Sequence, residues 1–362
     1  MRQNNYFITL FKALFFSMII VTTSSARAEL KVVTTIKPLY SLIANVMDGV
    51  GEPSLIIEGS TSPHSFTLKP SHAKLLEEAD LIFWVGEGIE TFMEGPLESI
   101  AKNAEVVEFM EVESIEKLKF REESIFGDHD DHDDHDDHDD HDDHDDHDDH
   151  DNHDDHDDHD DHDDHDDHDD HDDHDDHDDH DDHDDHDHHG HAHGEFDAHI
   201  WLDPSNAKEM VHEIAHELGD LDPANKDKYE ANAEATIIAL DQLIKDVSKD
   251  INKDAKFVVF HDAYQYFEER FGVRAAGALT LNTDVLPGAK QVADIQDVIK
   301  DKGINCIFSE PQFNPKIIST IAEDTNIKTG VFDPLGANIT SDKDLYFKLI
   351  SNLGNELKGC QY

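Results

Sequence analysis

The sequence predicts an α/β fold of two similar lobes with parallel sheets, joined by one long rigid helix, with a metal site in the cleft between the lobes. Short apolar, β-branched runs alternate with helical patterns over residues 31–109 and again over residues 257–332, as is typical of parallel sheets. Between them, residues 224–251 contain neither glycine nor proline and show apolar residues at helical spacing. Histidines lie near the ends of strand-like runs in both series, where α/β folds bind ligands.

Residues 1–28 have the features of a secretory signal peptide. Arg2 and Lys12 supply positive charge, residues 13–21 form a short apolar run, and residues 26–28 have the small-x-small form of a cleavage site. A membrane anchor is the alternative, but the apolar run is too short to span a bilayer. We therefore expect a cleaved signal peptide and a mature chain that begins at Glu29 and is soluble outside the cytoplasm.

The first alternating series predicts an N-terminal α/β lobe over residues 29–222. The expected strands lie at residues 31–36, 54–57, 81–85 and 105–109, and the expected helices at residues 39–47 and 69–78. The strands are rich in β-branched and aromatic residues. Glycines at 49 and 51 and the Pro70-Ser71 pair mark a helix end and a helix start.

The negative charge of the chain is concentrated in one segment. The formal charge is −58, but residues 128–193 hold 39 aspartates and 24 of the 30 histidines. Without those aspartates the charge is −19. No basic patch is present elsewhere, so the sequence predicts no nucleic-acid partner.

Residues 128–193, here called the Asp/His tract, repeat Asp-Asp-His with a period of three. The tract lacks the apolar residues that a core needs, so we expect a disordered insertion into a folded lobe. Long insertions are tolerated because the closure entropy grows only logarithmically with length. The tract is interpreted either as a solvated acidic spacer or as a weak, multi-site zinc collector that raises the local metal concentration.

After the tract, a strand-like run is expected at residues 200–202. A helix is expected over residues 207–218, with Ser205 as its N-cap and Gly219 at its end.

A linking helix is expected over residues 223–252, its apolar pattern running from 224 to 251. At about 1.5 Å per residue it would span about 40 Å, which is longer than one lobe.

The second series predicts a C-terminal α/β lobe over residues 253–362. The expected strands lie at residues 257–260, 273–279, 306–308 and 329–332, and the expected helices at residues 263–270, 291–302, 316–324 and 346–358.

The two cysteines of the chain are Cys306 and Cys360. In an exported protein an even pair indicates a disulfide, which would contribute about 4 kcal/mol by loop closure. Two free buried thiols are the alternative.

Three histidines are candidate metal ligands. His261 directly follows a strand, His64 lies in the loop after another, and His199 precedes the run at 200–202. Three neutral imidazoles with one carboxylate or water suit tetrahedral Zn²⁺, and Cu²⁺ or Ni²⁺ would also bind. Asp333 and Glu310 also follow strands, which adds two carboxylates at the same sheet edge.

The remaining histidines outside the tract are His72, His212 and His216. The last two are spaced i,i+4 on one expected helix, a spacing that can chelate a metal. They lack a position at a strand end, so we interpret them as part of an exposed helix face. We expect none of the three at the central site.

Several motifs together resemble those of the metal-binding solute receptors of ABC importers, and in particular the zinc-binding members. They are Ser62–Ser71, Asp197–Leu202, Phe260–Tyr264, Glu310–Phe313 and Phe332–Gly336. They occur in the order of that family and cover nearly the whole mature chain.

The resemblance implies two lobes with limited closure and metal-ligand roles for His64, His199 and His261. Manganese-type relatives have glutamate where this chain has His261, which favours zinc. Some zinc members have a glutamate before the first histidine, where this chain has Pro63, so the fourth ligand would be Asp333 or water. The implied function is high-affinity capture of Zn²⁺ for an inner-membrane ABC permease and its ATPase, by a monomer.

Three alternatives to this function remain open. A receptor for another divalent metal such as Mn²⁺ would use the same fold. A periplasmic zinc buffer or chaperone would depend on the tract. A zinc hydrolase could use three histidines and an open position, with Glu310 as a possible base, but no HExxH motif is present. We expect no enzymatic activity.

Overall fold

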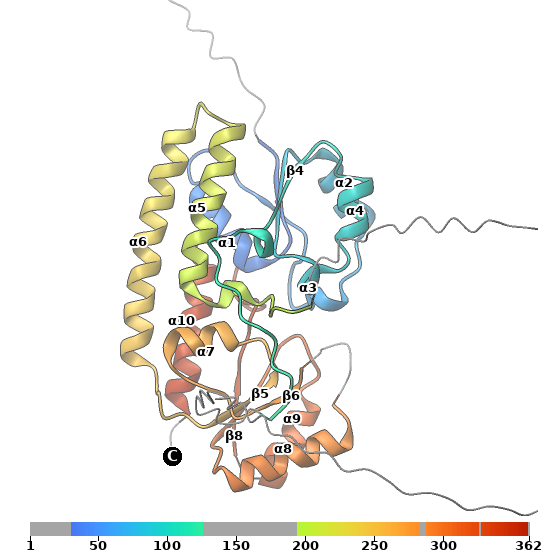
Figure 1. The fold of residues 1–362 in the computed structure, drawn as a ribbon, viewed down its shortest axis with the longest axis vertical. Helices are drawn as coiled ribbons and strands as arrows, with labels where there is room; N and C mark the ends of the chain where they lie inside the picture. The colour runs from blue at the N-terminus through green and yellow to red at the C-terminus, as the bar shows by residue number, and fades with distance from the viewer. Residues whose placement is uncertain (1–29, 126–193, 282–286, 326, 361–362) are drawn as a thin grey trace, which may run out of the picture. The chain divides into compact units, whose positions relative to one another are not determined.

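The computed structural model describes residues 30–125, 194–281, 287–325 and 327–360. Its strands form two four-stranded parallel sheets flanked by helices (Figure 1), which confirms the predicted α/β class. The expected signal peptide and the Asp/His tract lie outside the described residues. Within the described ranges, no helix has the length and apolar character needed to cross a membrane.

The first sheet has the strand order β2-β1-β3-β4, with every pair parallel. Its strands are β1 (Val32–Thr34), β2 (Ser54–Leu55), β3 (Leu81–Trp84) and β4 (Glu105–Glu108), each shorter than the sequence pattern predicted. The central strands β1 and β3 are buried along their whole length, which explains their continuous apolar runs.

The helices of the first sheet are α1 (Lys37–Val46), α2 (Pro70–Glu78), α3 (Glu87–Glu90) and α4 (Glu94–Ser99), with 3₁₀ turns η1 (Pro63–Ser65) and η2 (Phe109–Glu111). Helix α1 begins two residues earlier than predicted, because Pro38 fits the first turn of a helix.

The second sheet repeats the same topology in the order β6-β5-β7-β8, again all parallel. Its strands are β5 (Phe257–His261), β6 (Ala278–Thr280), β7 (Cys306–Ser309) and β8 (Lys328–Val331). Its helices are α7 (Gln265–Phe271), α8 (Ala289–Asp301) and α9 (Lys316–Thr325). Strand β5 includes His261 as its last residue, so this histidine stands at the carboxyl end of a central strand.

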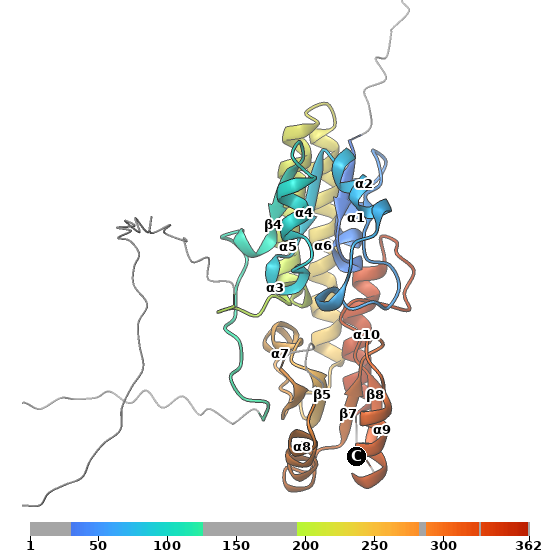
Figure 2. The ribbon, with the colours of Figure 1, turned by 90° about the vertical axis from the view of Figure 1, so that its right-hand side faces the viewer.

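Three longer helices are α5 (Pro204–Leu221), α6 (Lys226–Asp250) and α10 (Leu345–Gly359). Helix α6 runs beside α5 at the level of the first sheet and continues toward the second (Figures 1 and 2). Helix α10 packs against α6 and α1. A Cβ added at Gly354 would lie 2.9 Å from Cγ1 of Val247, so the close approach of α10 to α6 requires glycine there.

The expected disulfide between Cys306 and Cys360 is present, with the two Cα atoms 5.9 Å apart. It joins the start of β7 to the residue that follows α10.

The strand-like prediction for residues 200–202 is wrong, because this run forms the 3₁₀ turn η3 (Ile200–Leu202). Its carbonyls are bound by side chains instead of a neighbouring strand. The Asn206 amide donates to the carbonyl of Ile200 at 3.3 Å, and the Tyr346 hydroxyl donates to that of Trp201 at 2.7 Å.

The predicted ends of the next helix are also wrong. The N-cap of α5 is Asp203, whose carboxylate accepts from the Ser205 amide at 2.7 Å. The helix continues past Gly219, where a Cβ would lie 3.0 Å from Cγ of Lys226. This glycine therefore allows α6 to pack closely and does not end the helix.

Residues 116–125, here called the strap, lead from the first sheet to the second lobe (Figures 1 and 2). The Leu118 amide donates to the hydroxyl of Tyr266 at 2.9 Å, and the Ala278 amide donates to the carbonyl of Ser124 at 2.8 Å. The Asp197 amide in turn donates to the carbonyl of Leu118 at 2.8 Å. The strap thereby ties the segment behind the tract to the second sheet.

A buried carboxyl group connects the carboxyl ends of β1 and β3. Glu90 is fully buried and accepts hydrogen bonds from the Thr35 hydroxyl and from the amides of Val85 and Gly86. Burial raises the pKa of Glu90 to about 7, although these hydrogen bonds oppose the shift.

Glu90→Gln should change how stability depends on pH. Because folding raises the pKa of Glu90, its contribution is fully present below about pH 4.5 and is lost as the pH rises through about 7. The glutamine cannot ionise, so between pH ~5 and ~8 the variant should gain up to about 3 kcal/mol relative to the wild type. Urea unfolding at both pH values measures the difference, with Glu98→Gln on the exposed face of α4 as the control. If the free energy of unfolding changed equally with pH in the wild type and in Glu90→Gln, the role of Glu90 would be contradicted.

Candidate metal centre

Three histidines from separate parts of the sequence converge in the structure. They are His64 in η1, His199 before η3 and His261 at the end of β5. One ring nitrogen of each lies within 4.8 Å of the others. Within the described part of the chain, these three histidines form the one group of at least three His, Cys, Asp or Glu side chains placed to hold a metal ion.

The ring of His199 is held by Asp197, two residues earlier. Oδ1 of Asp197 lies 2.7 Å from Nδ1 of His199 and accepts from its backbone amide at 3.0 Å. Both side chains are buried. A hydrogen bond from Nδ1 to a carboxylate leaves the lone pair of Nε2 for a metal.

The ring of His261 is held in the same way by Glu310, which follows β7. Nδ1 of His261 lies 2.6 Å from Oε1 of Glu310. Strand β7 pairs directly with β5, so parallel pairing brings the ends of the two strands together. Desolvation lowers the pKa of His261, but the charge and hydrogen bond of Glu310 outweigh it, so the pKa lies above its ordinary value.

The two Nε2 atoms, of His199 and His261, face each other at 3.3 Å. Zinc–nitrogen bonds of about 2.0–2.1 Å at a tetrahedral angle require two ligand nitrogens about 3.3 Å apart. The observed separation therefore matches two ligands of one tetrahedral ion.

His64 supplies the third imidazole from the first lobe. Its ring centroid lies 5.6 Å from that of His199 and 6.1 Å from that of His261. Burial, together with these two neighbours, lowers the pKa of His64 to about 2. Burial also holds the pKa of His199 well below its ordinary value. Both rings are therefore neutral near pH 7, as metal binding requires.

The space at the three histidines is small and enclosed by apolar side chains. A cavity of about 10 Å³ is lined by the histidines together with Pro63, Trp201 and Phe313, among others. This volume corresponds to about one water-sized sphere. The site therefore fits a single ion better than an organic ligand.

A further layer of contacts fixes the segment that carries His199. The Trp201 indole donates to the carbonyl of Pro334 at 2.8 Å, and the Tyr266 hydroxyl donates to that of Asp197 at 2.6 Å. Arg121 of the strap pairs with Asp262 at 2.8 Å. The sequence did not predict these contacts, because each contact joins positions far apart in the chain.

Asp333, the expected carboxylate ligand, does not join the converging atoms. Its oxygens accept hydrogen bonds from the Gln312 amide at 3.1 Å and from the backbone amides of residues 335–337. Glu310 lines the cavity, and its carboxylate also interacts with the hydroxyl of Tyr264. Burial and this carboxylate hold the pKa of Tyr264 well above its ordinary value.

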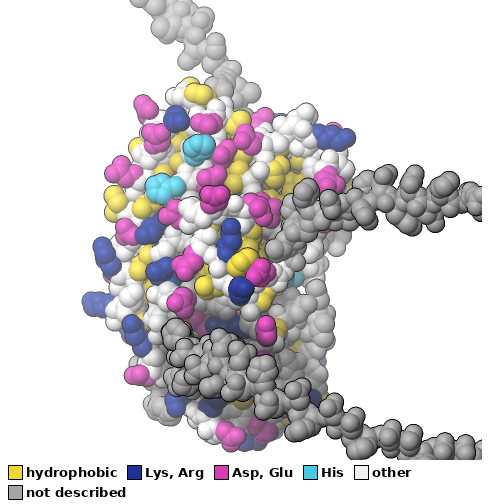
Figure 3. Space-filling view, viewed as in Figure 1, with side chains coloured by type: hydrophobic (Ala, Val, Ile, Leu, Met, Phe, Trp, Pro, Cys, Tyr) yellow, Lys and Arg dark blue, Asp and Glu magenta, His cyan; other side chains and the backbone are white. Residues whose placement is uncertain are grey.

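The other described histidines lie outside this cluster, as expected. His72 stacks on Phe66, with ring centroids 5.5 Å apart. His212 and His216 are exposed on α5. The surface carries acidic and basic side chains intermixed, with histidines on the face of α5 and α6 (Figure 3).

Comparison with known proteins gives a consistent result. The family model ZnuA, "Zinc-uptake complex component A periplasmic", matches residues 32–360. Relatives named "High-affinity zinc uptake system protein ZnuA" include one from Brucella abortus (strain 2308), 46% identical, with 91% of each chain covered. Another from Yersinia pestis is 31% identical, with 96% of each chain covered.

Solved structures share the fold. A crystal structure of ZnuA has a TM-score of 0.66 at 19% identity, covering 92% of this chain and 99% of that one. A ZnuA deletion mutant with zinc bound has a TM-score of 0.64 at 19% identity, covering 91% of this chain and 97% of that one.

Removing either carboxylate partner should weaken metal binding without removing a ligand. Asp197→Asn and Glu310→Gln should each lower the zinc affinity by about 10–100-fold, because the amide no longer favours the tautomer with a free Nε2. Competition with a zinc chelator, followed by fluorescence of Trp201 in a Trp84→Phe background, reports this site separately from the tract. Unchanged zinc affinity in both variants would contradict the roles of the carboxylates. Adding Gln312→Glu to either variant is not expected to restore the lost zinc affinity.

Zinc affinity should decrease as the pH is lowered, because zinc must displace two protons from the site. One occupies Nε2 of His261, whose pKa is raised. The other is on Asp197, whose pKa burial raises to about 7. Zinc displaces both, so the logarithm of affinity should fall by about two units per pH unit below about pH 6. In Asp197→Asn the slope should be about one, measured by the same fluorescence titration. A slope of three in the wild type would mean that His64 or His199 is also protonated.

Proposed function

Because this chain belongs to the ZnuA family of periplasmic zinc-uptake components, we propose that it is a high-affinity receptor for zinc. It captures Zn²⁺ in the periplasm and delivers the ion to an inner-membrane ABC permease and its ATPase. The signal peptide at residues 1–28 is cleaved on export, and the mature protein acts as a monomer. The observation that carries this proposal is the 3.3 Å separation of Nε2 atoms on two carboxylate-held histidines.

His64, His199 and His261 are the zinc ligands in this proposal. An all-imidazole set favours zinc over Mn²⁺, which prefers more oxygen ligands. The fourth position is filled by water or by a carboxylate. Asp333 would have to lose its hydrogen bonds to residues 335–337 to become a ligand. Glu310 holds Nδ1 of His261, on the side of the ring away from Nε2. Water is therefore the fourth ligand that requires the least rearrangement.

Release follows from where the ligands reside. We assign residues 29–222 and 253–362 to two lobes and residues 223–252 to the linking helix. His64 and His261 belong to different lobes, so a docking partner that separates the lobes separates the ligands. Captured zinc is then released without chemical change in the protein.

No catalytic function is proposed. A zinc hydrolase needs a base beside the metal-bound water. Glu310, the candidate base, instead holds Nδ1 of His261 at 2.6 Å. A role as a ligand support explains this contact without further assumptions.

The proposal is tested by zinc calorimetry on two versions of the mature protein. One lacks residues 128–193, and the other keeps the tract but carries His64→Ala, His199→Ala and His261→Ala. The first should keep one tight site, and the second should keep only weak sites, because the tract offers many equivalent but unorganised ligands. Growth of cells under zinc limitation should fail with the second version alone.

His72→Ala is the matched control, since it removes a histidine near the same loop but outside the cluster. If the tight site leaves with the tract and survives the triple substitution, the tract is the functional element. The protein would then act as a zinc buffer and the receptor proposal would be wrong.

A further inference from the structure

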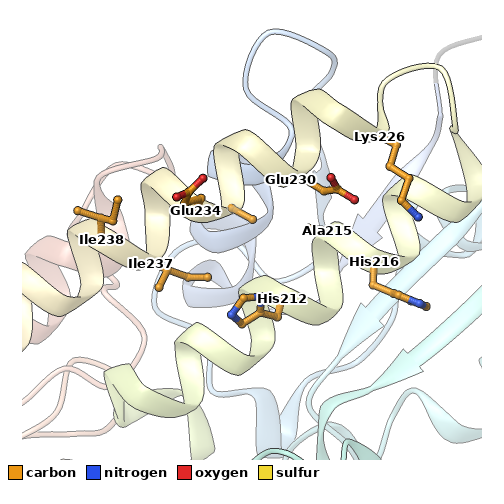
Figure 4. A pocket seen from close by; sticks show the side chains of 9 residues that line it. His212, Ala215, His216, Lys226, Glu230, Glu234, Ile237 and Ile238 are labelled. Atoms are coloured by element: carbon orange, nitrogen blue, oxygen red, sulfur yellow. The ribbon is translucent and has the colours of Figure 1, made fainter.

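A second group of metal-binding side chains lies on the outer face of the paired helices α5 and α6. His212 and His216 are one turn apart on α5, and Glu230 and Glu234 are one turn apart on α6. All four line one cavity of about 430 Å³. Figure 4 shows the pairs on facing helices, with the His212 imidazole turned toward α6.

The space exists because small residues face each other where the helices pack. Ala215 and Ala233 are buried and line the cavity between the two pairs. Ile237 and Ile238 close one end of the cavity, and Ile238 is 63% exposed. The cavity is therefore open to solvent and accessible to an ion.

The spacing of the histidines suits chelation. Side chains at i and i+4 of a helix are neighbours, about 5–6 Å apart at Cβ, and two histidines at this spacing can bind one Zn²⁺. Nδ1 of His216 lies 3.0 Å from Oε1 of Glu217. This contact repeats the carboxylate–imidazole pairing of the central site. Nε2 of His216 lies 3.9 Å from Oδ2 of Asp220, and a metal bound at Nε2 would replace this ion pair.

The charges around the cavity favour a cation. Glu230 and Glu234 contribute two negative charges, while Lys226 is the cationic side chain among the lining residues. Nζ of Lys226 lies 3.3 Å from Oδ1 of Asp220, so its charge has a carboxylate partner outside the cavity. Among the described residues, only the central histidines already converge as a set of three. Because His212, His216 and Glu230 are exposed, rotation of their side chains can bring their donor atoms together.

We propose that this cavity, here called the α5–α6 site, binds a second divalent transition-metal ion through His212, His216 and Glu230. Two imidazoles and a carboxylate suit Zn²⁺ and, more strongly, Cu²⁺. The site binds more weakly than the central one, because its exposed ligands must lose conformational freedom on binding. The site shares no residue with the central cluster, so it fills and empties independently of that cluster.

The test uses the full chain and paramagnetic Cu²⁺ as the probe. Methyl spectra of isoleucine-labelled protein report this site directly, because Ile237 and Ile238 line the cavity. Cu²⁺ should broaden these two methyl signals in the wild type, and excess Zn²⁺ should restore them. Ile304 is buried just before the amino end of β7, at the opposite end of the sheet from His261. It is the internal reference and should stay sharp.

Matched variants separate this site from copper bound elsewhere. The double variant His212→Ala, His216→Ala should abolish the broadening of both methyl signals. Glu230→Gln should lower the copper affinity obtained from the broadening by about tenfold. The triple substitution of His64, His199 and His261 should leave the broadening unchanged. His212, His216 and Glu230 are exposed, so they can be replaced without loss of the fold. An unperturbed signal of Ile304 verifies this.

Two results would overturn the proposal. Sharp Ile237 and Ile238 signals in the wild type with copper in excess over all histidines would mean that no ion enters the cavity. Broadening that persists in the His212→Ala, His216→Ala protein would assign it to copper bound by other residues. Neither result would affect the receptor proposal, which depends on the central histidines alone.

Discussion

The central site depends on two hydrogen bonds from imidazoles to buried carboxylates. Asp197 fixes the ring of His199 and Glu310 fixes the ring of His261. Each bond keeps Nδ1 of its ring engaged with a carboxylate, so the two Nε2 atoms face each other at 3.3 Å, where zinc replaces the proton on Nε2 of His261. Without these bonds the rings could turn or exchange tautomers, and the separation required by a tetrahedral ion would be lost.

The fold keeps these two pairs together by tying distant segments to one another. Parallel pairing of β5 and β7 brings Glu310 beside His261. The strap and Tyr266 hold the segment of Asp197 on the second lobe. On the other side, Nζ of Lys37 in α1 donates to the carbonyls of Gly336 at 2.5 Å and Ile339 at 2.6 Å. His64 reaches the site from the first lobe, where η1 follows β2.

Sequence patterns predicted the sheets because burial dictates composition. Parallel strands such as β3 and β5 are covered on both faces, so they appear as continuous apolar runs. Helix ends and the turn at residues 200–202 were mispredicted, because tertiary contacts decide them. Asp203 caps α5 while also pairing with Arg270, 67 residues away, through two hydrogen bonds of 2.6 and 2.7 Å. Local propensity contains no information about such a partner.

The candidate ligands could be found from sequence, but their supports could not. Histidine at a strand end is a local signal, and His261 shows it directly. The Asp-x-His spacing at residues 197–199 was also present, yet nothing local distinguishes a ring support from a surface aspartate. Glu310 lies 49 residues from His261, and only the pairing of β5 with β7 shows that they meet. Asp333 stands after a strand as well, but its carboxylate is engaged by its own loop.

Charge balance explains why carboxylates, and not neutral groups, hold the rings. A divalent ion in a buried site is costly unless nearby charges compensate it. Asp197 and Glu310 are 2% and 3% exposed and together match the charge of one Zn²⁺. Without metal, burial raises the pKa of Asp197 to about 7, so a proton takes up part of the negative charge. Zinc then replaces protons in the same low-dielectric space. The total charge of the site changes little, which keeps both the empty and the loaded receptor folded.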